Sequence, residues 1–180
     1  MRLQVMLEHP HRIDAHAIGE LAEELRSAID RLRNLLFELR PVALDVEGLG
    51  PAIRMCLEHA SKETGWTWDV VDDLEEEPPP EARVSGYRIA QEAVSNVRKH
   101  ADASHVSVRL ASVDGGLLLR IADDGAGFDP RQRPQPGHLG LSTLAERAEL
   151  AGGRATVTSE AGRGTTVECW LPTRSADDAS

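Results

Sequence analysis

The chain has 180 residues, of which 41% are hydrophobic, and its formal net charge is −10 at pH 7. This length suffices for one domain with its own core and a shorter additional segment. The acidic balance argues against direct nucleic-acid binding, because contacts to phosphates require a basic face. Cys56 and Cys169 have no CxxC partner, so we expect reduced thiols, as in the cytoplasm, rather than a zinc site or disulfides.

No apolar run approaches the ~20 residues that span a bilayer, and no signal peptide is present. We therefore expect any membrane anchor to lie in upstream segments outside this sequence.

The first predicted element is a long helix over about residues 13–40, which Pro41 ends. Four apolar residues recur in it at seven-residue intervals: Ile18, Leu25, Leu32 and Leu39. This spacing is typical of a helical bundle seam, within or between chains, although an ordinary core helix is the alternative.

A second helix is predicted over about residues 48–62 and a strand over 66–70. An acidic run follows and predicts a solvated loop stiffened by three prolines. Its acidic members are Asp72, Asp73, Glu75, Glu76 and Glu77. A third helix is predicted over residues 81–101.

Two strands, over residues 106–110 and 117–122, flank the hairpin-type turn Asp114-Gly115-Gly116. A mobile loop over residues 125–139, a fourth helix ending at Ala151 and a final hairpin complete the domain. The hairpin pairs residues 154–159 with 165–171. The predicted fold class is α+β: a two-layer α/β sandwich whose mixed, mostly antiparallel sheet carries helices on one face.

The third predicted helix carries a polar stripe of Arg88, Glu92, Asn96 and Lys99, opposite the apolar stripe that should face the sheet. Such a stripe is ordinarily the solvent-exposed face of a helix, but its composition favours a site. Asn96 offers an oxygen that suits Mg²⁺. Lys99 is placed to meet phosphates, and Glu92 to orient or deprotonate a hydroxyl or water.

Asp123 closes a predicted buried strand and begins the run Asp123-Asp124-Gly125-Ala126-Gly127. Its carboxylate can accept a hydrogen bond from the exocyclic amine of adenine and would repel the guanine carbonyl. Gly125 and Gly127 permit positive φ and close approach of backbone to a ligand. A glycine turn with a capping aspartate is the alternative. Neither a Rossmann fingerprint nor a Walker A loop fits these residues.

Gly137-His138-Leu139-Gly140-Leu141 opens the fourth helix. Backbone N–H groups at such a helix start favour phosphate, although a simple N-terminal turn is the alternative. We expect His138 to contact the ligand from a lid rather than to act as a catalyst.

In order, these segments resemble motifs of the Bergerat-fold ATPase superfamily shared by gyrase, MutL and histidine kinases. Residues 91–101 resemble its N box, 123–128 its G1 motif, 137–141 its G2 motif and 162–165 its last glycine motif. The resemblance implies ATP and Mg²⁺ as cofactors, with Asn96 holding Mg²⁺, Glu92 joining it through water, and both serving catalysis. The residues it implies at ATP are Asn96, Lys99, His100, Asp123, Gly125, Gly127, Phe128, Gly137, His138, Leu139, Gly140, Leu141 and Thr165.

Residues 29–41 and 44–50 resemble the second dimerisation helix and linker of sensor histidine kinases of the nitrate-sensor and desaturase-regulator type. This implies a partial dimerisation region (1–42), an ATPase catalytic domain (43–173) and a disordered tail (174–180). It also implies a cytoplasmic, homodimeric kinase. Its γ-phosphate would pass to a histidine and then to a response regulator receiver domain with a helix-turn-helix output domain.

The chain departs from the family pattern at the phosphoacceptor, which in the family is a histidine followed by aspartate. His9, His11 and His16 do not match this phosphoacceptor motif. We therefore expect the chain to bind Mg-ATP without phosphorylating itself, with the acceptor lying upstream. The alternatives are an anti-sigma-factor-type serine kinase, a gyrase- or MutL-like ATPase, and a nucleotide-gated interaction module.

Overall fold

The structure, a computed structural model, describes residues 42–128 and 139–173. The chain divides into two units, Met1–Arg40 and Pro41–Ser180, and all of the described residues belong to the second. The predicted long helix, its seam, His9, His11, His16 and the predicted tail lie outside the described residues, as do Gly137 and His138.

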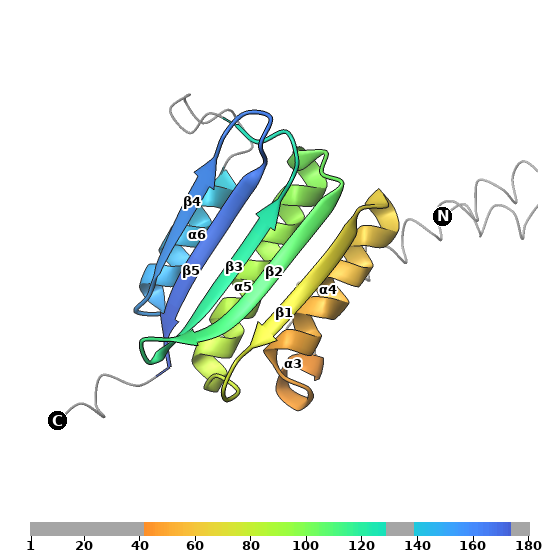
Figure 1. The fold of residues 1–180 in the computed structure, drawn as a ribbon. Coiled ribbons are helices and arrows are strands. Elements are labelled where there is room, and N and C mark those ends of the chain that lie inside the picture. The colour runs from red at the N-terminus through yellow and green to blue at the C-terminus, as the bar shows by residue number, and fades with distance from the viewer. Residues whose placement is uncertain (1–41, 129–138, 174–180) are drawn as a thin grey trace, which may run out of the picture. The chain divides into compact units, whose positions relative to one another are not determined.

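Five strands form one sheet in the order β1-β2-β3-β5-β4 (Figure 1). Only β1 and β2 pair in parallel, while β2–β3, β3–β5 and β5–β4 are antiparallel, so the predicted mixed, mostly antiparallel sheet is confirmed. The strands are β1 (Thr67–Asp73), β2 (His105–Val113), β3 (Gly116–Asp123), β4 (Arg154–Ser159) and β5 (Thr165–Pro172).

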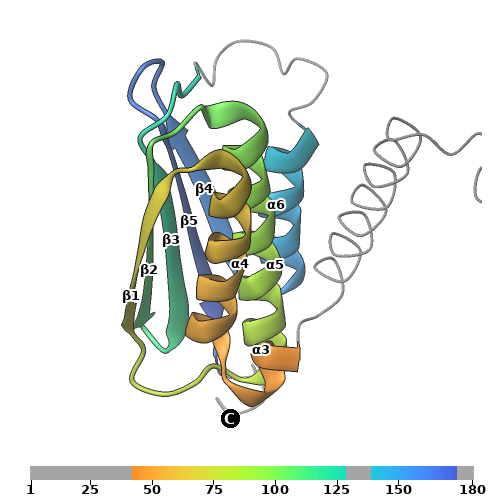
Figure 2. The same cartoon turned by 90° about the vertical axis from the view of Figure 1, so that its right-hand side faces the viewer.

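The described helices cover one face of this sheet and leave the other uncovered (Figure 2). They are α3 (Val42–Val46), α4 (Leu49–Thr64), α5 (Pro80–Asn96), a π-helix (Val97–Ala101) and α6 (Leu139–Leu150). Helix α4 packs on β1, α5 on β3 and β5, and α6 on β4 and β5. The predicted two-layer sandwich is therefore confirmed.

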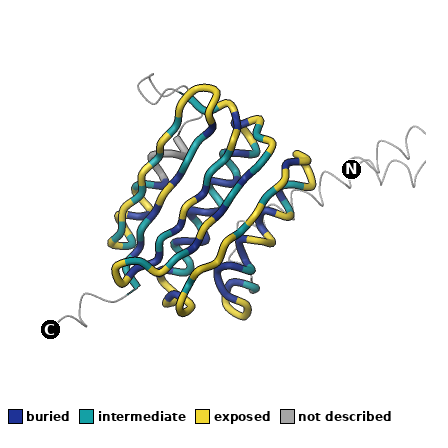
Figure 3. The backbone as a smooth tube through the Cα atoms, viewed as in Figure 1, coloured by how far each residue is buried: buried dark blue, intermediate teal, exposed yellow. Residues whose placement is uncertain are grey.

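The core lies between these two layers, and Figure 3 marks the buried positions along the strands and helices. Along β2 the side chains alternate, with Val106, Val108 and Leu110 fully buried between exposed or half-buried neighbours. Tyr87 and Ile89 of α5, the helix that packs on β3 and β5, are also buried, at 1% exposure or less. Burial of each such side chain contributes about 1.5–3 kcal/mol.

Local turn chemistry follows the prediction. Asp114 (φ 52°) and Gly115 (φ 68°) both adopt left-handed backbone, as a type I′ turn between β2 and β3 requires. Gly65 ends α4 with φ 77° and donates its N–H to the Ser61 carbonyl.

The prediction was wrong about the acidic run. Asp72 and Asp73 belong to β1 rather than to a loop, and Asp73 pairs with Arg109 of β2 at 2.9 Å. Glu77 is not simply solvated, because its Oε1 accepts the Leu49 N–H at 2.7 Å and so caps the start of α4.

Two helical features were not predicted. The short helix α3 precedes α4, and the third predicted helix is regular only to Asn96, after which it widens into the π-helix.

Cys56 and Cys169 are free and buried, and burial raises the pKa of each thiol to about 12. Within residues 42–128 and 139–173, no helix has the length and apolar character of a bilayer span.

Candidate functional site

A cavity opens where the C-terminal end of α5 and the π-helix face the ends of β3 and β5. Its lining residues come from these elements and from the loop after β3: Ala93, Asn96, Val97, His100, Ala101, Ile121, Asp123, Gly127, Phe128, Thr165 and Val167. The wall is apolar except for a few convergent polar groups, which is the usual character of a small-molecule site.

The π-helix supplies one side of this cavity. Its wider turn brings Asn96 and His100 to the same wall, one turn apart. The Asn96 side-chain Nδ2 is buried and has no hydrogen-bond partner among the described residues. A buried amide group without a partner costs about 1–3 kcal/mol, so its retention at a cavity wall points to a ligand.

Asp123 supplies the polar group on the sheet side. It is the last residue of β3 and lies directly opposite Thr165, the first residue of β5. Its Oδ1 accepts the Gly125 N–H at 2.9 Å. Desolvation raises the pKa of this carboxyl, although hydrogen bonds from the Gly125 and Thr165 backbones oppose the shift.

The two glycines after Asp123 are needed for different reasons. Gly127 has φ 56°, and a Cβ there would lie 2.1 Å from the Glu160 carbonyl oxygen. Gly125 does not have positive φ, so that part of the prediction was wrong. It is required by crowding instead, since a Cβ would lie 2.2 Å from the Ala101 carbonyl oxygen.

The loop after β3 is joined to the β4–β5 turn beneath the cavity. The Gly162 N–H donates to the Ala126 carbonyl at 2.6 Å. The Phe128 N–H donates to Ser159 Oγ at 2.9 Å, and the Ser159 hydroxyl donates to the Gly164 carbonyl at 3.0 Å. Sequence reasoning missed Ser159, because nothing local marks a strand serine as part of a site.

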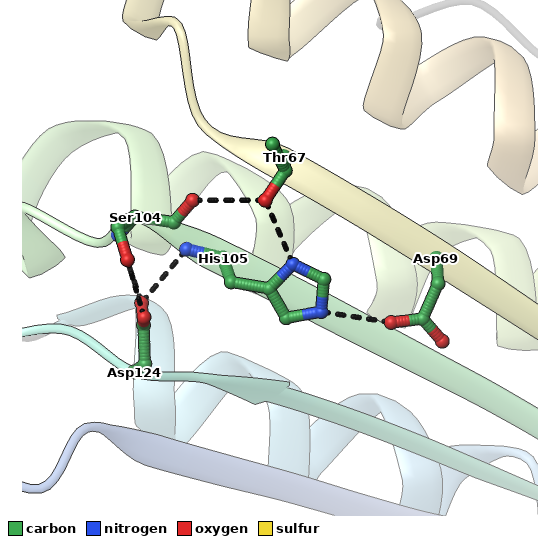
Figure 4. A network of polar contacts seen from close by, with 5 residues as sticks. All are labelled: Thr67, Asp69, Ser104, His105 and Asp124. Atoms are coloured by element: carbon green, nitrogen blue, oxygen red, sulfur yellow. Dashed lines mark hydrogen bonds and ion pairs between the residues drawn. The ribbon is translucent and has the colours of Figure 1, made fainter.

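Asp124 anchors the same loop on the outer side of the sheet (Figure 4). Its Oδ1 accepts the backbone N–H groups of Ser104 and His105, each at 2.8 Å, and its Oδ2 accepts the Ser104 hydroxyl. These bonds, that of the Ser104 hydroxyl first, lower the pKa of Asp124 to about 2. His105 in turn contacts Thr67 and Asp69 of β1, so β1, β2 and the loop are linked.

Six of the sequence-predicted site residues line the cavity: Asn96, His100, Asp123, Gly127, Phe128 and Thr165. Glu92 is half-buried and Lys99 exposed, and neither lines it; Gly125 lies just outside. Leu139, Gly140 and Leu141 begin α6. The remaining lining residues were not predicted as site residues: Ala93, Val97, Ala101, Ile121 and Val167. Of these, Val97 and Ala101 belong to the stripe predicted to face the sheet.

Within the described ranges, no group of three or more His, Cys, Asp or Glu side chains could hold a metal ion. A divalent cation at this cavity would therefore depend on Asn96 and on oxygens of a bound ligand. Mg²⁺ is commonly bound in this way, through few protein groups and substrate phosphates.

Comparisons with known proteins agree with this geometry. Residues 82–175 match the family of histidine kinase-, DNA gyrase B- and HSP90-like ATPases. An uncharacterised sensor-like histidine kinase of Chloroflexus aurantiacus is 35% identical over 176 residues, 91% of this chain and 29% of that protein. The signal transduction histidine-protein kinase/phosphatase DegS of Brevibacillus brevis is 31% identical over 156 residues, 86% of this chain and 40% of that protein.

Solved structures show the same fold. The blue-light activated histidine kinase of Erythrobacter litoralis EL346 superposes with a TM-score of 0.62 at 21% identity, over 89% of this chain and 52% of that one. The mycobacterial sensor histidine kinase MprB superposes with a TM-score of 0.52 at 22% identity, over 69% of this chain and 95% of that one. The chain spans less than half the length of the two relatives above. It belongs to the histidine kinase-, DNA gyrase B- and HSP90-like ATPase family, and the two relatives above are named as histidine kinases.

Proposed function

We propose that the cavity between α5, the π-helix and the ends of β3 and β5 binds Mg-ATP, with the adenine against Asp123 and the phosphates toward Asn96. The observation that carries the proposal is the convergence of two groups in one apolar cavity. These are the Asn96 amide, whose nitrogen has no hydrogen-bond partner in the described part of the chain, and the desolvated Asp123 carboxyl. A purine ring suits the apolar wall, and its exocyclic amine suits the carboxylate.

In this proposal Asn96 provides an oxygen ligand for Mg²⁺, and Glu92, one helical turn earlier, joins through water. Mg²⁺ supplies charge neutralisation at the phosphate oxygens when bound. His100 lies at the same wall as Asn96, and Lys99, although exposed and outside the lining, is one position away. Both are placed to meet phosphate groups that extend from the cavity mouth. Leu139, Gly140 and Leu141, with Gly137 and His138 before them, would add phosphate contacts at the start of α6.

For the whole kinase we propose transfer of the ATP γ-phosphate to a histidine and then to the receiver domain of a response regulator with a helix-turn-helix output domain. The protein would act as a cytoplasmic homodimer, dimerised through the region of residues 1–42. The names of the two relatives, a sensor-like histidine kinase and a signal transduction histidine-protein kinase/phosphatase, support the phosphorylation of a histidine.

Nucleotide selectivity tests the proposal directly. Mg-ATP should raise the Tm of the chain and Mg-GTP should not, because a 6-oxo group would face the Asp123 carboxylate. Asp123→Asn should abolish the ATP-dependent shift. The control is Asp114→Asn, at a remote turn whose left-handed backbone asparagine tolerates. Equal shifts with both nucleotides, or an unchanged shift in Asp123→Asn, would contradict the assignment.

Removal of the Asn96 amide tests the cation site. Asn96→Ala should raise the Kd for Mg-ATP by about tenfold or more, the loss expected for one interaction with a charged partner. Without Mg²⁺, in EDTA, the variant and the wild type should bind ATP alike. Titration calorimetry at several Mg²⁺ concentrations measures both quantities, with Ser95→Ala as the matched control. A variant that keeps the wild-type Mg²⁺ dependence would exclude Asn96 as a ligand.

A further inference from the structure

Ser159, at the end of β4, lies where the loop after β3 meets the β4–β5 turn. Its hydroxyl oxygen accepts the Phe128 N–H at 2.9 Å. Its proton is donated to the Gly164 carbonyl oxygen at 3.0 Å. A third contact, at 3.1 Å, joins Ser159 Oγ to Thr165 Oγ1. Phe128 and Thr165 both line the cavity, whereas Ser159 itself does not.

The direction of the third hydrogen bond follows from the first two. A serine hydroxyl has one proton and two acceptor lone pairs. The Ser159 proton is committed to the Gly164 carbonyl, which cannot donate. The Thr165 hydroxyl must therefore be the donor in the contact with Ser159. Thr165 has one hydroxyl proton too, so its oxygen can only accept hydrogen bonds from anything else.

This arrangement places two acceptors side by side at the cavity. Asp123 and Thr165 face one another across the β3–β5 pairing, and both line the cavity. An exocyclic amine on a purine has two N–H donors and suits such a pair. A 6-oxo group would bring a third acceptor against them and leave polar groups unpaired, which is costly in a desolvated site.

We propose that Ser159 is a positioning residue for base selectivity, which acts by fixing the Thr165 hydroxyl as an acceptor toward a 6-aminopurine. The inference rests on the proposed ATP site and adds a determinant of its specificity. Without the serine hydroxyl, Thr165 loses the acceptor that holds its proton and can rotate to donate to a 6-oxo group. Selectivity then falls even where the domain stays folded.

The experiment compares the Kd values of ATP and inosine triphosphate, which differ at the 6-position, for the wild type and variants by titration calorimetry. In Ser159→Ala the ratio of the two Kd values should fall by about fivefold, the value of one neutral hydrogen bond. Ser159→Thr keeps the hydroxyl and should restore the ratio. Thr158→Ala, an exposed neighbour on β4, is the matched control and should leave the ratio unchanged.

A double-mutant cycle separates this role from a merely structural one. In a Thr165→Val background, Ser159→Ala should leave the ratio unaltered, because the serine acts through the threonine hydroxyl. A loss of affinity for both nucleotides by the same factor would overturn the proposal, and so would an equal change in both backgrounds. If Ser159→Ala does not fold, Thr165→Ser must keep the wild-type ratio and Thr165→Val must lower it; any other result overturns the proposal.

These outcomes are distinct from failure of the proposed function. A wild-type chain that binds neither nucleotide would contradict the ATP site itself. A wild-type chain that binds ATP and inosine triphosphate equally would contradict the recognition of the base by Asp123 and Thr165, but not the binding of ATP in this cavity.

Discussion

Asp123 and Asp124 are adjacent carboxylates whose pKa values move in opposite directions. Desolvation at the cavity raises that of Asp123 above its ordinary value of 3.8, whereas hydrogen bonds from Ser104 and His105 lower that of Asp124 to about 2. The first carboxyl is desolvated at the cavity, and the second anchors the loop after β3 to the backbone of Ser104 and His105. Opposed shifts of this kind are a mark of functional sites.

The two shifts predict opposite effects of pH on stability. Asp124 stabilises the native state above about pH 3.8, and this contribution is lost as the pH falls toward 2. Asp124→Asn should therefore lower the Tm at neutral pH, and the deficit should shrink on acidification. A raised pKa acts in the reverse sense, since stability is lost as the pH rises through the native pKa of Asp123. Asp123→Asn without nucleotide should thus raise the Tm at neutral pH.

Thermal unfolding of both variants between pH 2 and 7 measures these differences. The Tm gain of Asp123→Asn should disappear as the pH falls below 3.8, where the Asp123 side chain becomes neutral in both the folded and the unfolded state. Parallel pH profiles for the two variants would show that the carboxylates have the same environment, contrary to the structure.

At the scale of elements, the π-helix is held by the loop that follows β3. The Ala126 N–H donates to the Ala101 carbonyl at 2.6 Å, and Gly125 packs against the same carbonyl. The sequence periodicity continues through residue 101 as if the helix were regular. The widening depends on a contact with residues more than twenty positions away, which no local pattern encodes.

Gly125→Ala tests this coupling. The added methyl group cannot fit beside the Ala101 carbonyl, so the loop must move away from the π-helix. We expect a loss of about 1–3 kcal/mol in the free energy of unfolding, together with weaker ATP binding. Gly115→Ala, in an open turn with φ 68°, is the control for backbone strain. It should cost about 1–2 kcal/mol without altering the Kd for ATP. Denaturant unfolding and calorimetry measure both.

Other boundaries show why part of the fold was predictable. The β2–β3 turn could be predicted, because Asp114 and Gly115 readily adopt the positive φ that the turn requires. The end of β1 could not be predicted, because β1 is an edge strand whose Asp69, Val71 and Asp73 side chains are exposed. Backbone pairing with β2, and contacts of Asp69 with His105 and of Asp73 with Arg109, keep these acidic residues in the sheet. None of these partners is local in sequence, so the composition of the segment resembles that of a loop.

For the whole molecule, the site residues also divide into those that the local sequence marks and those that only the fold brings together. The local pattern of their own helix or strand pointed to Asn96 and Asp123, and both line the cavity. Ser159 could not, because its partners Phe128 and Thr165 are brought to it only by the β4–β5 hairpin and its contact with the loop after β3. Glu92 and Lys99 lie on the predicted face but outside the cavity lining, since the helix face is wider than the cavity.

The strand order has a consequence for the synthesis of the protein. β5 inserts between β3 and β4, so the floor of the cavity joins two strands that α6 and β4 separate along the chain. A nascent chain already carries Asn96 and Asp123 before Thr165 has been translated. Because Thr165 and Val167 of the cavity lining are then missing, we expect nucleotide to bind only after the last strand has emerged and paired. By mass action, ATP should then stabilise the completed fold and not its precursors.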